Sequence, residues 1–422
     1  MPSVAPGRAY SLYVLILLTL VYITNFVDRI VLGILVGPIK AELALSDSQL
    51  GLLGGTAFAL FYTALGIPVG WWADRSSRVR IMTAALVCWS LFTALTGSAG
   101  SFLTLFLARL GVGVGEAGGV APAYALIADY FRPGWRARAL GCFSLGVPIG
   151  SALAYLLGGY LTTVFSWRAV FIWLGGAGLL IAPLLLLTVR EPERGRLDAA
   201  PAVGAAPLAL VWRTLAAKPA FWLLSLGAGC GSLMGYGLLF WLPSFFIRSD
   251  GLSVLQASRV LGALLLFGGV PGILLGSYLA DRVGMRDRRA YALVPAVAFL
   301  CILPCYALGT SLPMGPAAFV CFLLPAALQL VWLGPVITAV QQLVPATMRS
   351  LASAIFLFIN NLLGLGLGAL IIGFTSDQLA ARFGSAALRY AILGGTVFYL
   401  LAAGLFLAAA RRLPRDFGPL TA

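Results

Sequence analysis

The sequence GWWADRSSRVR occupies residues 70–80, and a shorter copy, GSYLADR, occupies residues 276–282. Each copy follows a long apolar run. A second pair of related stretches lies at nearly the same spacing, with PGWRARAL at residues 133–140 and PATMRSLA at residues 345–352. Self-similarity at a fixed spacing indicates an internal repeat. We therefore expect a chain built from two related halves.

The composition points to a membrane protein. Of the 422 residues, 61% are apolar and only 10% are charged, whereas soluble domains carry about 25% charged residues. A spanning helix needs about 20 mostly apolar residues. We predict an all-α membrane protein with twelve transmembrane helices, at roughly 10–37, 48–72, 79–98, 101–130, 136–162, 167–189, 219–247, 256–281, 289–309, 315–342, 347–376 and 386–411.

One long connection divides these helices into two groups of six. Residues 190–218 are rich in Arg, Ala and Pro and show little periodicity, which is typical of a linker. The predicted organisation is an N-terminal six-helix bundle at 1–189, a cytoplasmic linker at 190–218 and a C-terminal six-helix bundle at 219–422.

The positive charges predict the orientation. The net charge is +14, and the chain contains 28 Lys and Arg residues. Twenty of them lie at the termini and in the even-numbered loops, six lie on the opposite side, and Arg29 and Arg109 lie inside apolar runs. Cytoplasmic loops are enriched in Lys and Arg. We expect a multi-pass protein of a bacterial inner membrane with both termini in the cytoplasm, and no binding of nucleic acid.

Several classes of function are disfavoured by what the sequence lacks. The chain has no His, and its six Cys form no C-x-x-C pair, so we expect no metal site, no cofactor and no enzymatic activity. Neither of the two Lys, Lys40 and Lys218, follows a Gly, which argues against the phosphate-binding loop of an ATP-driven pump. A receptor or scaffold without transport activity remains an alternative.

The motif at 70–80 and its copy near Asp281 resemble the loop signature of the major facilitator superfamily. A narrower resemblance to the Spinster family is carried by five further stretches, most of them in the first half. They are NFVDR at 25–29, RLGVGVGEA at 109–117, APAYALIAD at 121–129, VPIGSALAY at 147–155 and VREPERG at 189–195.

This resemblance implies a transporter with proton-linked activity, and animal members are associated with lysolipids and sphingoid phosphates. It also implies that the loop charges form a cytoplasmic latch. A solvated cluster that only sets topology is the alternative, since exposed ion pairs contribute about 0–1 kcal/mol. The latch residues are Gly70, Asp74, Arg75, Arg78, Asp129 and Arg138, with Asp281 and Arg282 from the second copy.

Four charges lie well inside apolar runs: Asp28, Arg29, Arg109 and Glu116. A charge at the bilayer centre costs at least about 2.5–3.5 kcal/mol, so it persists only with a partner or a wet cavity. Arg109 and Glu116 are two helical turns apart and share a face. Asp28 and Arg29 point about 100° apart. We predict that Asp28 and Glu116 are the proton-coupling groups.

Arg109 and Arg29 are predicted to control the protonation of Asp28 and to bind an anionic headgroup. For Arg29, a structural or snorkelling role is the alternative. A static salt bridge between the first and fourth helices is the alternative. The predicted cavity lining combines this charged half with an aromatic, uncharged half, which suits an amphipathic substrate. The lining residues are Tyr22, Asn25, Tyr124, Tyr155, Tyr236, Trp241, Gln329, Trp332, Asn360 and Asn361.

The leading hypothesis is a monomeric, proton-coupled secondary transporter that moves a small amphipathic or lipid-like molecule by alternating access, as an exporter that exchanges it for protons. Its partners are then the substrate, protons and membrane lipids. A uniporter, or a symporter of a polar metabolite, remains open, because the sequence names no substrate.

Overall fold

The structure is a computed structural model that describes residues 7–73, 75–194, 207–284, 286–345 and 348–417. Helices make up nearly all of these residues, and none of the described residues forms a strand. Asp74, which was predicted to belong to the latch, lies outside them, and the structure does not describe the side chain of Asp281.

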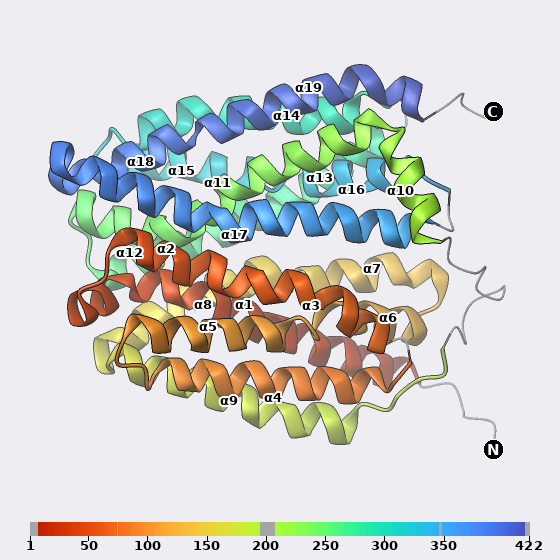
Figure 1. Cartoon of the computed structure of the whole chain (residues 1–422), viewed down its shortest axis with the longest axis horizontal. Coiled ribbons are helices and arrows are strands. Elements are labelled where there is room, and N and C mark those ends of the chain that lie inside the picture. Colours follow the sequence, from red (N-terminus) through yellow and green to blue (C-terminus); the bar gives the residue numbers. More distant parts are fainter. Residues whose placement is uncertain (1–6, 74, 195–206, 285, 346–347, 418–422) are drawn as a thin grey trace. The chain divides into compact units, whose positions relative to one another are not determined.

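The chain divides into two compact units (Figure 1). Unit 1 comprises Met1–Ala44 and Ala57–Ala202, and unit 2 comprises Leu45–Thr56 and Val203–Ala422. The helices of unit 1 are α1 (Arg8–Leu43), α3 (Ala57–Ala73), α4 (Arg78–Thr96), α5 (Phe102–Glu116), α6 (Val120–Tyr130), α7 (Pro133–Ser144), α8 (Gly146–Val164) and α9 (Trp167–Thr188).

The helices of unit 2 include α2, from the second predicted span, and α10, from the predicted linker. They are α2 (Asp47–Gly51), the π-helical turn Leu52–Thr56, α10 (Leu208–Ala216), α11 (Pro219–Asp250), α12 (Val254–Leu264), the π-helical turn Leu265–Gly269, α13 (Val270–Val283), α14 (Ala290–Gly309), α15 (Pro316–Leu328), α16 (Leu333–Gln342), α17 (Arg349–Phe383), the 3-10 turn Gly384–Ala386, α18 (Ala387–Gly395) and α19 (Val397–Asp416).

The predicted all-α transmembrane architecture is confirmed. Among the described residues, eleven continuous helical stretches are long and apolar enough to cross a membrane. The last of them, Leu351–Asp416, contains both of the final predicted spans. These two spans are separated by the turn at Gly384, whose φ of 53° is a backbone conformation that favours glycine. Within the predicted linker, the structure adds one short helix, α10, that the sequence periodicity did not indicate.

The internal repeat is visible in the packing. In unit 1, α1 packs on α8 and α4 packs on α9; in unit 2, α11 packs on α17 and α14 packs on α19. These pairs join the first and fifth, and the third and sixth, spans of each half. The fourth span of each half is interrupted, between α5 and α6 and again between α15 and α16. The two halves therefore share one plan.

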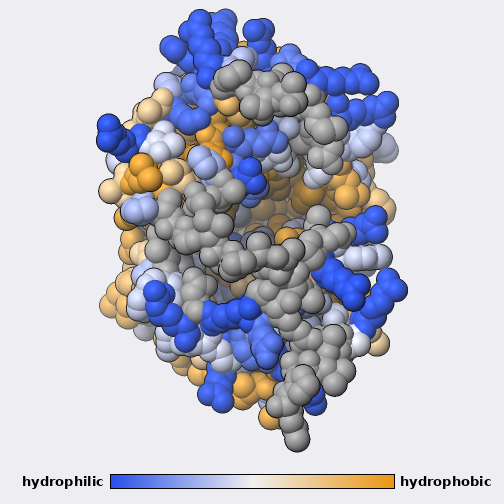
Figure 2. Space-filling model, turned by 90° about the vertical axis from the view of Figure 1, so that its right-hand side faces the viewer, coloured by the Kyte–Doolittle hydropathy of each residue, from blue (hydrophilic) through white to orange (hydrophobic). Residues whose placement is uncertain are grey.

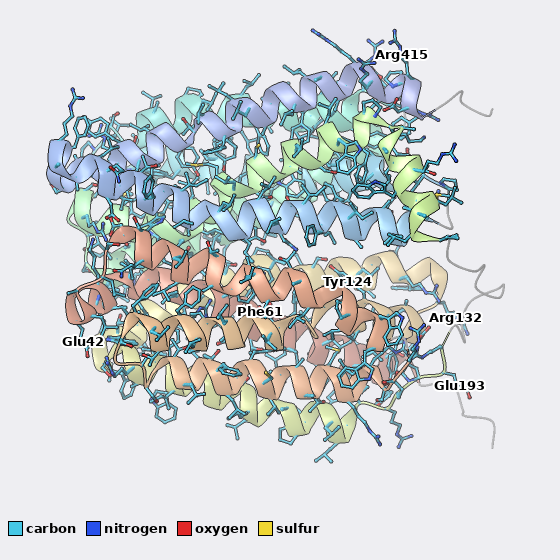
Figure 3. The ribbon with its side chains drawn as sticks, in the orientation of Figure 1. Glu42, Phe61, Tyr124, Arg132, Glu193 and Arg415 are labelled. Carbon is cyan, nitrogen blue, oxygen red and sulfur yellow. The ribbon has the colours of Figure 1, made fainter. Side chains whose placement is uncertain are left out.

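Charged residues lie at helix ends in both units. In unit 1, Arg132 and Glu193 lie at the end opposite to Glu42, and in unit 2 Arg415 lies near the end of α19 (Figure 3). Among the residues coloured in Figure 2, which shows the right-hand side of Figure 1, hydrophilic side chains are prominent. This distribution fits spanning helices whose charged ends meet water.

The second predicted span is shared between the units, because Leu45–Thr56 packs within unit 2. Asp47 is 3% exposed, and its carboxylate accepts two hydrogen bonds from Arg248, at 2.6 and 2.9 Å, and one from the Ser376 hydroxyl. The carboxylate of Asp377 accepts hydrogen bonds from the backbone N–H groups of Asp47 and Ser48. These bonds satisfy donors at the start of α2 that have no partner within the helix.

Small residues allow this segment to approach α17 closely, which gives a first prediction. A Cβ atom at Gly51 would lie 2.4 Å from the backbone oxygen of Ala369. We expect Gly51→Ala to destabilise the protein by about 1–3 kcal/mol through overpacking. Gly66 in α3 has nothing within 4 Å of such an atom, so Gly66→Ala is the matched control and should be neutral or stabilising. Thermal unfolding in detergent compares the two; equal melting temperatures would contradict the close contact.

Candidate functional site

Four ionisable side chains lie together inside unit 1. Asp28 and Arg29 come from α1, and Arg109 and Glu116 come from α5; they are 2%, 6%, 0% and 0% exposed. Their formal charges cancel. Burial on this scale is costly for any one charge and tolerable for a set of opposite charges in contact.

Arg29 and Glu116 form the direct ion pair of the cluster. Arg29 Nη2 lies 2.6 Å from Glu116 Oε2 and also donates to Asn25 Oδ1 at 3.2 Å. The guanidinium sits over three aromatic rings, those of Phe26, Phe58 and Tyr62, at 4.6–4.9 Å from their centroids. Cation–π contacts favour a cation at such a desolvated position. The sequence analysis assigned Arg29 to headgroup binding and pKa control. Its alternative, a salt bridge between the first and fourth helices, did not name this pair.

Arg109 is held differently. Its Nη1 donates to the backbone oxygen of Asp28 at 3.2 Å, while its Nε and Nη2 have no hydrogen-bond partner among the described atoms. Its charge acts on the carboxylates of both Asp28 and Glu116. Arg109 is thus a fully buried cation with two donor atoms that have no partner among the described atoms.

The four predicted cavity residues of unit 1 lie in three different surroundings. Tyr22 and Asn25 line a small cavity together with Leu18, Val21, Met82, Trp89, Gly119, Val120 and Phe143. Tyr124, which Figure 3 labels, is 40% exposed. Its ring lies edge-on to that of Phe143, with 5.5 Å between the ring centroids. Tyr155 has no exposed surface, so it belongs to the packed interior of the bundle. Phe58, Tyr62 and Trp89 were not predicted as part of the site.

In unit 2 the predicted lining residues are uncharged, and several of them form hydrogen bonds within the unit. Asn360 accepts a hydrogen bond from Ser232 at 2.7 Å, and Gln329 accepts one from Tyr399 at 3.4 Å. Trp241 is fully buried and donates to the backbone oxygen of Ala369, so it packs between helices of its unit. The remaining members are Trp332, which is 5% exposed, and Tyr236 and Asn361, which are half-buried.

Two of the predicted latch residues, Arg78 and Asp129, contact each other inside unit 1. Arg78 is 3% exposed and contacts Asp129 at 2.5 Å and Glu191 at 2.7 Å. Arg138 is exposed and lies over the ring of Trp135. Asp129 is therefore held by α4, and Glu191, which follows α9, completes the cluster. The VREPERG stretch contained Glu191 but gave no sign of its partner.

The other members make only local contacts among the described residues. Arg75 donates to the backbone oxygen of Trp71 at 3.1 Å, and Arg282 donates to the hydroxyl of Tyr278, four residues before it. Gly70 has open space where a Cβ atom would lie.

The comparison with known families decides what kind of protein this is. The family model of the Major Facilitator Superfamily matches residues 18–369. The chain belongs to the major facilitator superfamily. This family consists of membrane transporters, in agreement with the two six-span halves and with the resemblance of the loop motif at residues 70–80.

Two relatives connect the chain with an efflux pump and with Spinster proteins of that superfamily. An MFS-type efflux pump from Mycolicibacterium smegmatis is 34% identical over 412 residues, covering 97% of this chain and 95% of that protein. Protein spinster homolog 1 from Xenopus tropicalis is 29% identical over 435 residues, covering 96% and 82%. The predicted Spinster-like character is confirmed.

A solved structure extends this relationship to three dimensions. The crystal structure of a bacterial homologue of the human lysosomal transporter Spinster, in an inward-facing and unoccupied conformation, is 32% identical and has a TM-score of 0.88, covering 97% of this chain and 99% of that one. A D-xylose–proton symporter, at 16% identity and a TM-score of 0.69, shares the fold alone.

Proposed function

We propose that this Spinster-like transporter couples the export of a small amphipathic or lipid-like molecule to the entry of protons. The buried cluster in unit 1 carries the proposal. A carboxyl group beside a fixed cation can exchange a proton as the cation engages or releases another anion. Asp28 is the proposed proton acceptor, Glu116 is a second titratable group, and Arg109 is the cation that substrate and carboxylate share.

The direction and the substrate class rest on further observations. The 34% identical relative is named an efflux pump, and the structural relative is named for a lysosomal transporter. None of the six predicted lining residues of unit 2 is charged, and three of them, Tyr236, Trp241 and Trp332, are aromatic, which suits the apolar part of an amphiphile. The excess of arginine in the even-numbered loops supports an orientation with both termini in the cytoplasm of a bacterial cell.

A transport assay tests the substrate class. Proteoliposomes with a pH gradient are supplied either with a fluorescent lysophosphatidylcholine, recovered from the outer leaflet with albumin, or with radiolabelled glucuronate. We expect the gradient to drive movement of the lipid only, and Arg109→Ala to lose it. Glucuronate is the informative rival because a hexuronate transporter from Bacillus subtilis is 28% identical over 282 residues. Gradient-driven movement of glucuronate that Arg109→Ala leaves intact would refute the amphiphile assignment.

A further inference from the structure

Helix α4 presents two polar side chains to Asp28. Trp89 and Thr93 are one helical turn apart, so they lie on the same face of α4, and they are 1% and 0% exposed. The side-chain groups that act on the Asp28 carboxyl are these two from α4 and the charges of Arg109 and Glu116 from α5. Arg29, beside Asp28 on α1, is directed to Glu116 instead.

The hydroxyl of Thr93 is free for this role, in contrast to other threonines of the same helix. Thr83 and Thr96 each donate to the backbone oxygen four residues earlier, at 2.9 Å. This is the usual way in which a helical threonine satisfies its hydroxyl. Thr93 makes no such bond, and its Oγ1 has no hydrogen-bond partner among the described atoms.

The indole of Trp89 is in the same situation. Its Nε1 is buried and has no acceptor among the described atoms, and neither has Nδ2 of Asn25 on α1. Both residues also line the small cavity of unit 1, which has room for about one water molecule. A buried N–H or O–H without an acceptor is costly. The indole N–H of Trp89 and the hydroxyl of Thr93 both lack an acceptor and both face the carboxyl group of Asp28, which is therefore their expected acceptor.

We propose that Trp89 and Thr93 are positioning residues that donate hydrogen bonds to the ionised carboxylate of Asp28, so that α4 joins α1 and α5 in forming the proton site. This inference rests on the proposed role of Asp28. Donors to a carboxylate favour its charged form. They hold Asp28 ionised and ready to accept a proton, and protonation of Asp28 weakens the hydrogen bonds that they donate.

Infrared titration of the full-length protein tests this proposal without a substrate. The C=O stretching band of a protonated carboxylic acid is recorded against pH, and the part that Asp28→Asn removes is assigned to Asp28. In Thr93→Val, which keeps the shape and loses the donor, we expect the midpoint of this band to move to higher pH by about one unit. Thr93→Ser should restore the wild-type midpoint. Trp89→Phe should shift it in the same direction, and provides the test if Thr93→Val does not fold.

Thr96→Val is the matched control. It makes the same change on the same helix at a hydroxyl that is bonded to the backbone, so its midpoint should equal that of the wild type. Unchanged midpoints in Thr93→Val and Trp89→Phe, or an equal shift in Thr96→Val, would overturn the role of α4. A different result, in which Asp28→Asn removes no band at any pH, would instead refute the proposed proton acceptor.

Discussion

Asp28→Asn is expected to abolish transport driven by a proton gradient, reducing it to the level of protein-free liposomes. Asparagine has nearly the same shape as aspartate, but its side-chain amide does not take up a proton at the pH values at which a carboxylate does. Because it also removes one negative charge from the buried cluster, Arg109 is left with Glu116 as its opposing charge. The measurement is gradient-driven flux of fluorescent lysophosphatidylcholine in proteoliposomes with equal amounts of each protein.

A matched control makes this result interpretable. Asp287 is exposed, and its carboxylate accepts a hydrogen bond from the backbone N–H of Arg289. Asp287→Asn makes the same chemical change outside the spans and should transport at the wild-type rate. Gradient-driven flux in Asp28→Asn equal to that of Asp287→Asn would show that Asp28 has a structural role, as in the static salt-bridge alternative.

Glu116→Ala is expected to cause the largest loss of stability. It removes the carboxylate that Arg29 contacts at 2.6 Å, in a position where the two side chains are 6% and 0% exposed. Breaking a buried ion pair by removing one partner costs about 3–5 kcal/mol, because the remaining charge stays buried. Arg109 loses a neighbouring negative charge at the same time. Thermal unfolding in detergent should show a large fall in melting temperature.

Glu42→Ala tests whether the burial of an ion pair, and not ion pairing itself, accounts for the loss of stability. Glu42 contacts Arg168 at 2.7 Å, a similar distance, but these side chains are 51% and 30% exposed. Water and salt screen such a pair, so its loss costs about 0–1 kcal/mol. Glu42 also accepts a hydrogen bond from Trp167. The loss of stability in Glu42→Ala therefore includes this bond and is an upper limit for the contribution of the ion pair. If both variants lost the same stability, the buried cluster would not be the special feature that its geometry indicates.

The sequence predicted the architecture well because membrane spanning leaves few alternatives. Runs of about 20 apolar residues, separated by arginines, define the spans, and the repeated GWWADR and GSYLADR stretches indicate the two halves. The breaks within spans were harder to foresee. Gly118 and Gly119 lie where the fourth span is interrupted, but glycine is common in spanning helices and does not by itself mark a break.

The buried cluster was predicted as a set of residues, and its pairing was not. Four charges that sum to zero predict mutual contact, but sequence gives no distance between α1 and α5. That distance decides that Arg29 reaches Glu116, while Arg109 bonds the backbone of Asp28. Trp89 and Thr93 were missed because a Trp and a Thr inside a span look like ordinary packing residues. Only the missing partners of their polar atoms distinguish them.

The measurement that tests the central claim most directly is the change in luminal pH that accompanies substrate movement. Proteoliposomes containing a pH-sensitive dye are loaded with lysophosphatidylcholine on the inside, with no initial pH gradient, and albumin outside removes the lipid as it leaves. The proposed exchange predicts that the lumen becomes acidic as lipid leaves, and that Asp28→Asn shows no acidification. Lipid efflux at a constant luminal pH, or with a rise in pH, would contradict coupled export in exchange for protons.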